Sequence, residues 1–248
     1  MSTESTVVVS GAGTGIGRAV ASRLAADGFH VTAVGRRKEP LELLAGELGQ
    51  RVHTVTADVA TDTGAAEVAA NVASAGLACA GIVAAAGGVS AGDVPGHGLD
   101  QVRREWQASF ESNVLTAVLL VEAMREAIQR DGGRVVLVSS VAALRGGGGG
   151  PYAAMKAALH GLAFDLAREL GAHGGTANVI APGFVPDTEF WAGRLTAESR
   201  QDRAAQTLVG RAGTPAEIAS LIAWLLGPEG GWMTGQVLSP NGGAVLGR

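Results

Sequence analysis

The sequence has little of what a disulfide, a metal site or a nucleic-acid-binding surface needs. Cys79 is the only cysteine among 248 residues, which excludes an internal disulfide and a cysteine-based metal site. The five histidines are scattered without the spacing of metal ligands, so we expect no metal. Lysine and arginine number 19 against 23 acidic residues, and no basic run occurs. This balance argues against nucleic acid as the main partner.

Targeting segments and long apolar runs are also missing. The N-terminus carries no positively charged region, and its only early apolar run is Val7 to Val9, which argues against a secretory signal. Residues 68–92 contain no charge, but alanine and glycine dominate them and large aliphatic side chains are few. This segment is more typical of a helix end, a turn and a buried strand than of a membrane span. We therefore expect a cytoplasmic protein with no membrane partner.

Glycine, by contrast, is abundant, with 38 residues of 248, about twice the usual share. Glycine and proline together stay below the share of low-complexity chains, and the hydrophobic fraction of 47% excludes disorder. A globular chain this rich in glycine needs many tight turns or close approaches of its backbone.

Short apolar runs alternate with amphipathic segments along the chain. The pattern predicts strands at residues 7–10, 31–34, 52–57, 81–86, 134–139, 176–181 and 236–239. Between them it predicts helices at residues 17–27, 41–48, 63–73, 101–128, 151–170 and 214–226. Nearly continuous apolar strands separated by helices are typical of a parallel sheet covered on both faces. We therefore predict an α/β fold, with residues 1–248 forming a single-domain, Rossmann-like, doubly wound parallel sheet.

A glycine-rich segment, Gly11-Ala-Gly-Thr14-Gly15-Ile16-Gly17, joins the first predicted strand to the first helix. Its glycines let the backbone turn tightly and approach a pyrophosphate, and the helix that follows directs free N–H groups and its positive dipole end toward phosphates. The spacing G-x-x-x-G-x-G differs from the common dinucleotide fingerprint, and an ordinary glycine-rich turn is the alternative. Its place in the first strand–helix turn favours phosphate binding.

Charged residues follow the second and third predicted strands, where a dinucleotide's adenosine would lie. The second strand ends in Arg36, Arg37 and Lys38, without the acid that NAD enzymes place on the ribose. A guanidinium binds a phosphate through a fork of donors, so we predict NADP(H); a solvated, charged helix start is the alternative. Asp58, before Val59, suits a hydrogen bond from the adenine amino group, and a helix N-cap is an equal alternative.

Tyr152 is the only tyrosine of the chain, and Lys156 follows it by four residues. On a helix the two side chains share one face, about a turn apart. A phenol is a poor acid–base catalyst near neutral pH, since its pKa is about 10, and a neighbouring ammonium lowers that pKa. Ser139 and Ser140 end the preceding strand, from which a hydroxyl can reach a substrate carbonyl. Taken alone, the tyrosine and lysine are more simply explained as a coincidental surface pair.

Several motifs, in this order, resemble the short-chain dehydrogenase/reductase family. They are Gly11-x-x-x-Gly15-x-Gly17, Asp58-Val59, Asn113, Ser139-Ser140, Tyr152-x-x-x-Lys156, Pro182-Gly183, the segment 210–217 and the segment 234–243. The similarity covers nearly the whole chain and is strongest to 3-oxoacyl-acyl-carrier-protein reductases and related carbonyl reductases. It implies a catalytic group of Ser, Tyr152, Lys156 and Asn113. Tyr152 would donate a proton to the carbonyl, Lys156 would lower its pKa and bind the nicotinamide ribose, and Asn113 would hold a water linking Lys156 to solvent.

The resemblance leaves the catalytic serine open. The family's motif places it second in the serine pair, at Ser140, whereas the family's usual distance to the tyrosine places it at Ser139. Because loop lengths vary more readily than strand ends, we favour Ser140. Ser139 would then line the nicotinamide pocket.

The remaining cofactor contacts implied by the resemblance include departures from the family's pattern. The family's Asn-Asn-Ala-Gly is Ala84-Ala-Ala-Gly87 here, so Ala85, Ala86 and Gly87 would contact the cofactor through their backbone only. After Pro182 and Gly183 the expected threonine comes one residue late, as Thr188, and we assign it to the carboxamide together with Val185. Asn241 stands where aspartate is commoner in the family.

The resemblance places the substrate lid at about residues 184–206. Phe190, Trp191 and Leu195 either form an apolar substrate wall or serve plain packing. The run Gly146–Gly150 lies where family members contact substrate, yet it offers no side chains. His160 follows Lys156 by one turn, and a packing role is the preferred interpretation.

We therefore predict an NADPH-dependent reductase of a ketone or β-ketoacyl thioester, acting on a small-molecule or acyl-carrier-bound carbonyl substrate. Two alternatives remain: an alcohol or sugar dehydrogenase that works in the oxidative direction, and an NADP-binding sensor or scaffold without turnover. The helices at 101–128 and 151–170 resemble the family's oligomer-forming pair, which implies a homotetramer.

Overall fold

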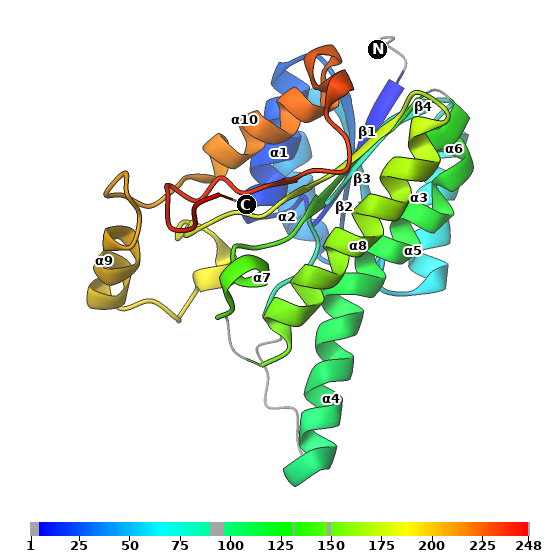
Figure 1. Cartoon of the computed structure of the whole chain (residues 1–248). Coiled ribbons are helices and arrows are strands. Elements are labelled where there is room, and N and C mark those ends of the chain that lie inside the picture. Colours follow the sequence, from blue (N-terminus) through cyan, green and yellow to red (C-terminus); the bar gives the residue numbers. More distant parts are fainter. Residues whose placement is uncertain (1–4, 90–96, 131, 148–149, 248) are drawn as a thin grey trace.

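Seven parallel strands form one sheet at the centre of the molecule (Figure 1). The computed structural model describes residues 5–89, 97–130, 132–147 and 150–247. The strands are β1 (Ser5–Ser10), β2 (His30–Gly35), β3 (Val52–Thr56), β4 (Ala78–Ala84), β5 (Arg134–Val138), β6 (Thr176–Ile180) and β7 (Val237–Leu238). Their order is β3-β2-β1-β4-β5-β6-β7, and each neighbouring pair runs parallel. The predicted parallel sheet is confirmed, with each predicted strand present.

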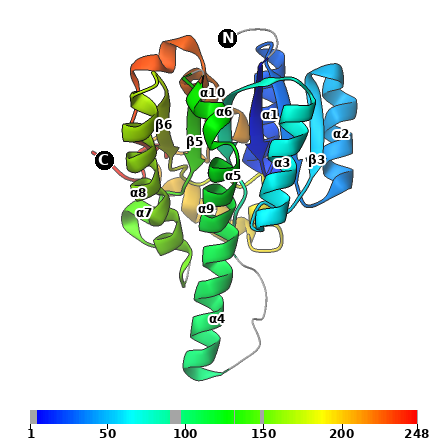
Figure 2. The same cartoon turned by 90° about the vertical axis from the view of Figure 1, so that its right-hand side faces the viewer.

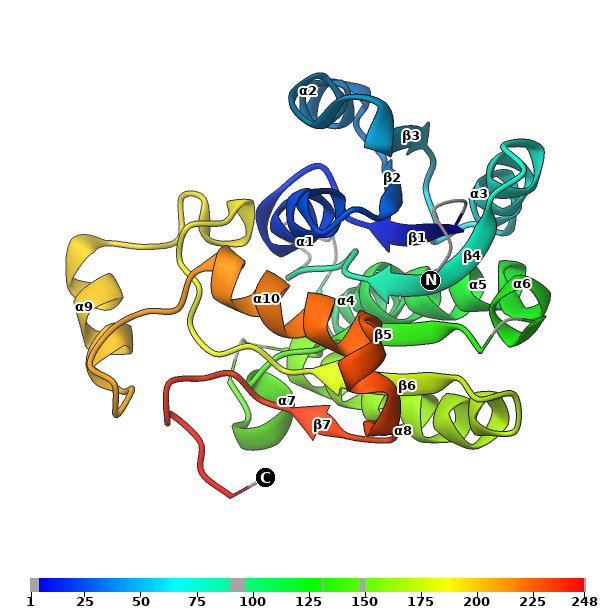
Figure 3. The ribbon, with the colours of Figure 1, turned by 90° about the horizontal axis from the view of Figure 1, so that it is seen from above.

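Helices cover both faces of the sheet, as Figures 2 and 3 show. One hydrophobic core joins the sheet to α1 (Gly15–Ala26), α2 (Lys38–Leu48) and α10 (Pro215–Leu226). A second core lies on the opposite face, against α3 (Asp62–Ser74), α5 (Thr116–Ala123), α6 (Arg125–Arg130) and α8 (Tyr152–Gly171). The alternate residues of β1 divide between the two cores, with Val7 and Val9 in the first and Val8 in the second. This is why the strands are apolar on both faces.

The strand order reverses between β1 and β4. The chain runs outward from β1 through β2 to β3, and then crosses to β4 and continues through β5 and β6 in the other direction. At such a switch point the loops at the carboxyl ends of the two strands diverge and leave a crevice, which is where open α/β sheets bind ligands. We therefore expect the ligand site at the loops after β1 and β4.

The helix predicted over residues 101–128 is interrupted. It consists of α4 (Gly98–Phe110), a π-helical turn (Glu111–Leu115), α5 and, after a break at Met124, α6. The apolar stripe continues through these pieces but changes its surroundings. Val102, Trp106 and Phe110 are 47%, 44% and 42% exposed, because α4 projects beyond the sheet (Figures 1 and 2). Within the described part of the chain, no helix has the length and apolarity to cross a bilayer.

The segment after β6, residues 186–206, lies apart from the two cores. It contains the short 3-10 helix η3 (Glu189–Trp191) and helix α9 (Ala197–Ala205), which Figures 1 and 3 show at the periphery of the molecule. Both α9 and α10 begin with a capping box, Thr196 with Ser199 and Thr214 with Glu217. Reciprocal caps satisfy the first backbone N–H groups of each helix. The predicted start of the last helix at Thr214-Pro215 is thereby confirmed.

Candidate active site

A cavity of about 1080 Å³ opens at the carboxyl ends of the strands. It is lined by almost all the residues that the sequence predicted for the site. They are Gly11, Thr14, Gly15, Ile16, Gly17, Arg36, Arg37, Asp58, Val59, Ala85, Ala86, Gly87, Ser139, Ser140, Tyr152, Lys156, Pro182, Gly183, Val185 and Thr188. Of the predicted catalytic and cofactor-binding residues, only Asn113 does not line the cavity.

The glycine-rich loop after β1 presents the start of a helix to this cavity. Helix α1 begins at Gly15, two residues earlier than predicted, and its N-cap, Thr14, makes no side-chain capping bond. Gly15 has φ +53°, and a Cβ on Gly17 would lie 2.2 Å from the carbonyl oxygen of Gly11. The loop is therefore closed to larger residues, and the first N–H groups of α1 receive no side-chain cap. These features fit a pyrophosphate at the helix N-terminus.

Arginine side chains mark the end of β2. Arg36 and Arg37 are both exposed and line the cavity. Arg37 forms an ion pair with Glu189 of η3, whereas Arg36 has no ion pair with any described carboxylate. The positive charges and the lack of an acid at this strand end fit a ribose phosphate.

Asp58 lies at the same end of the cavity, after β3. Its Oδ1 accepts a hydrogen bond from the Ala60 N–H at 3.0 Å. The N-cap of α3 is Thr61, whose hydroxyl accepts from the Gly64 N–H. The alternative interpretation of Asp58 as a helix N-cap is therefore wrong, and its place at the cavity remains compatible with adenine binding.

Tyr152 and Ser140 meet at the other end of the cavity. Tyr152 is the first residue of α8 and is 7% exposed. Burial raises the pKa of its phenol, because the charged phenolate loses hydration, and a side-chain hydrogen bond with Ser140 partly lowers the pKa again. The Ser140 hydroxyl also accepts a hydrogen bond from the Ala142 N–H at 3.1 Å. Ser140, the serine we favoured from the sequence, is thus the serine whose hydroxyl acts on the pKa of the tyrosine.

The neighbouring Ser139 hydroxyl points to helix α8 instead. It donates to the carbonyl oxygen of Lys156 at 2.7 Å and lies 3.0 Å from Nε2 of His160. Because a hydroxyl carries one proton, His160 must be the donor in the second bond. The sequence suggested only packing for His160. Its position one turn after Lys156 was the available signal, but the contact also depends on where β5 ends.

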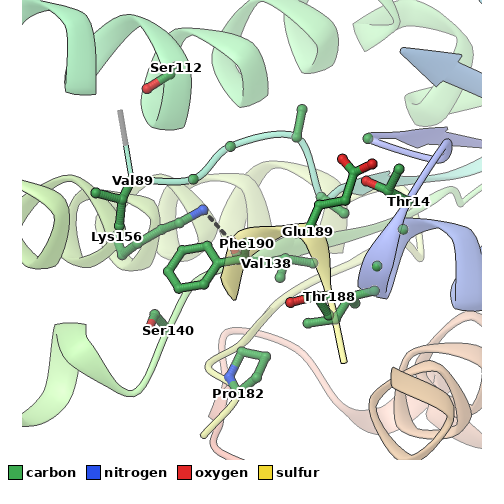
Figure 4. Close-up of a pocket in the computed structure, with 18 of the residues that line it drawn as sticks. Thr14, Val89, Ser112, Val138, Ser140, Lys156, Pro182, Thr188, Glu189 and Phe190 are labelled. Carbon is green, nitrogen blue, oxygen red and sulfur yellow. Dashed lines mark hydrogen bonds between the residues drawn. The ribbon is translucent and has the colours of Figure 1, made fainter. Parts of the chain in front are cut away.

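Lys156 is fully enclosed between β5 and α8. Its Nζ donates to the carbonyl oxygen of Val138 at 3.0 Å (Figure 4), and burial lowers the pKa of this ammonium to about 8. Nζ lies 5.9 Å from the centroid of the Tyr152 ring. The lysine was expected to lower the pKa of Tyr152, but in this structure burial dominates and raises it. The Ser140 hydroxyl partly offsets this rise.

Asn113 lies in the π-helical turn and is fully buried. Its Oδ1 accepts from the Gly88 N–H at 2.9 Å, and its Nδ2 donates to the Gly88 carbonyl at 2.9 Å and the Ser109 carbonyl at 3.1 Å. A Cβ on Gly87 would lie 2.8 Å from this Oδ1 and 3.0 Å from Nζ of Lys156. Gly87 thus permits the close approach of the two side chains. Insertions of this π type are frequent at functional sites, and the sequence pattern gave no sign of this one.

The segment after β6 closes one side of the cavity. The Phe190 ring lies 5.7 Å from the Tyr152 ring, and Trp191 packs edge-on against Phe184 and Phe190. A Cβ on Gly15 would lie 3.2 Å from the Cβ of Thr188, so η3 covers the glycine-rich loop. Phe190 and Trp191 line the cavity, whereas Leu195 does not. Leu195 is therefore removed from the predicted apolar wall.

Four charged lining residues had no individually predicted role. They are Arg145 of α7 (Ala142–Arg145), Glu189 of η3, and Arg194 and Arg203 of the segment after β6. Gly146 and Gly147 of the predicted glycine run also line the cavity, with no atom close to where a side chain would begin; Gly148 and Gly149 lie outside the described residues. Across the described ranges, no group of three metal-ligating side chains occurs.

Comparisons with known proteins agree with this geometry. Residues 11–245 match the family model described as enoyl-(acyl carrier protein) reductase. The short-chain reductase protein NovJ of Streptomyces niveus is 35% identical, over 98% of this chain and 95% of that protein. The 3-oxoacyl-[acyl-carrier-protein] reductase FabG of Escherichia coli is 33% identical, over 96% of each chain.

Solved structures of similar proteins share this fold. A short-chain dehydrogenase/reductase from Brucella melitensis superposes with a TM-score of 0.88 at 27% identity, with 98% of each chain covered. A blue fluorescent protein from a metagenomic library, crystallised in complex with NADPH, gives a TM-score of 0.84 at 31% identity, with 97% of this chain and 98% of that one covered.

Proposed function

The chain belongs to the short-chain dehydrogenase/reductase family, and we propose that it reduces the carbonyl of a ketone or β-ketoacyl thioester to a secondary alcohol with NADPH. The observation that carries this proposal is that Ser140, a buried Tyr152 and a buried Lys156 come together at one end of the cavity. A neutral phenol in this position is a proton donor.

In this proposal Arg36, Arg37 and the glycine-rich loop would hold the cofactor, which would supply the hydride to the carbonyl carbon at the end of the cavity where Tyr152 lies. Tyr152 donates its proton to the carbonyl oxygen, which it can do because burial keeps the phenol protonated. Ser140 holds the phenol in place and shares the developing charge. The Lys156 ammonium donates to the Val138 carbonyl and places a positive charge at this end of the site. Asn113 fixes the Gly88 backbone next to Lys156.

Several observations support NADPH over NADH. Two arginines line the cavity at the end of β2, where NAD enzymes carry an acid on the ribose. Arg36 has no ion pair with a described carboxylate and is exposed to an incoming phosphate. The metagenomic relative was crystallised with NADPH. FabG, by its name, acts on acyl-carrier-bound substrates, and this supports a β-ketoacyl thioester as one substrate class for this chain.

We further propose that the protein assembles as a homotetramer. The exposed apolar side chains Val102, Trp106 and Phe110 of α4 lie on one stripe, and Phe164 of α8 is 45% exposed. Exposed apolar patches of this kind mark association surfaces, and this helix pair resembles the one that forms oligomers in the family.

Steady-state NADPH oxidation tests the proposal, with β-ketoacyl thioesters, cyclic ketones and quinones as substrates. The wild-type protein should oxidise NADPH with at least one of them, with a higher kcat/KM than with NADH. Tyr152→Phe keeps the ring and removes the proton, so kcat should fall by about 10²–10⁴ while NADPH binding persists. Near-normal kcat in this variant would overturn the mechanism. Tight NADPH binding without turnover of any carbonyl would favour a sensor or scaffold instead.

A further inference from the structure

Some of the charged side chains that line the cavity form ion pairs, and others do not. Asp58 and Glu189 are the only acids among the described lining residues, and Glu189 is already paired with Arg37. Beyond that pair, Arg194 and Arg203 line the cavity without an ion pair to any described carboxylate. The chain as a whole has a net charge of −4. The cavity therefore carries local positive charge, although the net charge of the whole chain is negative.

Ring contacts connect these two arginines to the proposed proton donor. The Phe190 ring lies 5.7 Å from the Tyr152 ring, and the Arg194 guanidinium lies 5.7 Å from the centroid of Phe190. The Arg203 guanidinium lies 4.8 Å from the centroid of Trp191, whose ring touches Phe190. Figure 4 shows the Phe190 ring projecting into the cavity on the side of Lys156. Each guanidinium is thus separated from Tyr152 by aromatic rings.

A guanidinium packed on a ring keeps most of its hydrogen-bond donors. Stacking uses the face of the group, whereas its five N–H donors lie along the edge. Arg194 donates one hydrogen bond, to the Val89 carbonyl at 3.3 Å. Arg203 contacts the rings of Phe184 and Trp191 and forms no hydrogen bond with a described residue. Stacking also restricts the side chain, which reduces the entropy lost when an anion is bound.

A third arginine adds to the positive field without stacking. Arg145 of α7 lines the cavity and donates to Oε1 of Gln206 at 3.3 Å. A neutral amide leaves its charge uncompensated. Three unpaired arginines without a described acid beside them would repel one another less if an anion lay between them.

We propose that Arg194 and Arg203 form an anion subsite, so that the preferred substrate carries a carboxylate or phosphate, separated from its carbonyl by an apolar portion that lies against Phe190. This inference rests on the proposed function, because it assigns a substrate class to the same cavity. It explains why both arginines are anchored on rings and left without carboxylate partners, which packing alone does not require.

Two matched substrate pairs test the subsite. The first pair is levulinate and its methyl ester, and the second is S-acetoacetyl-phosphopantetheine and S-acetoacetyl-pantetheine. Within each pair the carbonyl is the same and only the anion differs. In the wild type, kcat/KM should favour the anion in at least one pair, and which pair responds separates a carboxylate from a phosphate.

The double variant Arg194→Gln with Arg203→Gln should reduce that preference about tenfold, because it lowers the kcat/KM of the anionic member more than that of the neutral member. Arg200→Gln is the matched control, because Arg200 lies on the same helix as Arg203, pairs with Asp187 and does not line the cavity. A preference unchanged in the double variant, or an equal loss for neutral substrates, would overturn the subsite and indicate a packing role.

Binding measured without NADPH separates this inference from the proposed function. Calorimetric titration of the cofactor-free protein with the members of each pair should give a lower Kd for the anion, and the double variant should remove the difference. If no carbonyl is reduced yet this difference is found, the reductase proposal fails and the subsite stands. If neutral and anionic members are reduced and bound equally well, reduction stands and the subsite is refuted.

Discussion

The guanidinium of Arg37 and the carboxylate of Glu189 form an ion pair, at 2.5 Å, that joins the end of β2 to η3. The two residues are 152 positions apart in the sequence, and both line the cavity. The pair therefore connects the predicted adenosine end of the site to the segment that covers the glycine-rich loop. An arginine predicted to bind the cofactor's ribose phosphate is occupied here by a carboxylate, so the two anions would compete for it.

Replacing Glu189 by glutamine should strengthen NADPH binding. The substitution removes the competing negative charge but keeps the shape of the side chain. Both partners are more than half exposed, so the ion pair is screened and its loss should lower the Kd of NADPH only about two- to fivefold. NADH, which lacks the ribose phosphate, should gain little. Fluorescence titration with both cofactors measures the effect.

Glu198→Gln is the control, because Glu198 is an acid of the neighbouring α9 that does not line the cavity. It should leave both Kd values unchanged. An equal gain for NADH would show that Glu189 blocks entry in general and does not compete for Arg37.

Removing the Ser140 hydroxyl should slow the reaction more than removing the Ser139 hydroxyl. The Ser140 hydroxyl lowers the pKa of Tyr152, whereas the Ser139 hydroxyl bonds to the Lys156 carbonyl and to His160. Ser140→Ala should lower kcat by about 10²-fold, and Ser139→Ala should act mainly on stability. Steady-state kinetics and urea unfolding of the two variants separate these effects. A larger loss of kcat in Ser139→Ala would reverse the assignment.

Burial of Lys156 predicts a dependence of stability on pH. Its pKa is lowered from 10.5 to about 8 because the buried ammonium loses hydration. Between these values the unfolded chain holds a proton that the folded chain has released, so the free energy of unfolding rises with pH across this window. Below pH 8 both states are protonated, and the folded state bears the cost of the buried charge.

Lys156→Met isolates this effect, because methionine does not titrate. Relative to the variant, the wild type should gain on the order of 3 kcal/mol of unfolding free energy as the pH rises from neutral to about 10.5. Urea unfolding across this pH range measures the difference. A wild type that loses stability relative to Lys156→Met over the same range would contradict the buried position of the ammonium.

The parts of the fold and site that follow from local pattern were predictable. Strand and helix alternation, the glycine-rich loop and the Tyr152–Lys156 spacing each depend on residues close together in the sequence. The capping box at Thr214 is equally local. The position of Arg36 at the end of β2 follows from the same logic, because the carboxyl ends of parallel strands meet at one edge of the sheet.

What the sequence could not predict depends on distant contacts. The π-helical turn at Asn113 interrupts a helix whose apolar periodicity is continuous, and the Asn113 side chain bonds to Gly88, a residue of a distant loop. In the sequence, Arg194 and Arg203 look like ordinary surface charges. Only the structure shows that they pack on Phe190 and Trp191, and that Phe190 lies beside Tyr152. His160 appeared to be a packing residue for the same reason, since its partner Ser139 lies at the end of β5 and not on the helix of His160.

A charge on the exposed stripe of α4 should reduce the size of the assembly. Trp106 is 44% exposed, and its neighbours Val102 and Phe110 lie on the same side of the helix. Trp106→Glu would bury a carboxylate in the proposed contact, which is costly without a partner. Sedimentation should show a smaller species than the wild type. Leu43→Glu, at an exposed leucine on α2, should leave the mass unchanged. A wild-type protein that sediments as a monomer would refute the tetramer.

Two glycine-to-alanine substitutions should have opposite effects, because only one of the glycines is confined. A Cβ on Gly17 would lie 2.2 Å from the Gly11 carbonyl oxygen, so Gly17→Ala must displace the loop. Overpacking of this kind should cost about 1–3 kcal/mol of unfolding free energy, together with NADPH affinity. Gly46 is exposed within α2, with no atom within 4 Å of a Cβ. Gly46→Ala should add about 0.5–1 kcal/mol, because alanine restricts the unfolded chain and favours the helix.

Urea unfolding measures both stabilities, and fluorescence titration measures NADPH binding. Gly46→Ala should bind NADPH as the wild type does, because it touches nothing near the cavity. If Gly17→Ala kept both its stability and its affinity, the tight packing of Gly17 on Gly11 would not be needed. The glycine-rich loop would then be an ordinary turn, and the proposed phosphate site at the start of α1 would lose its main support.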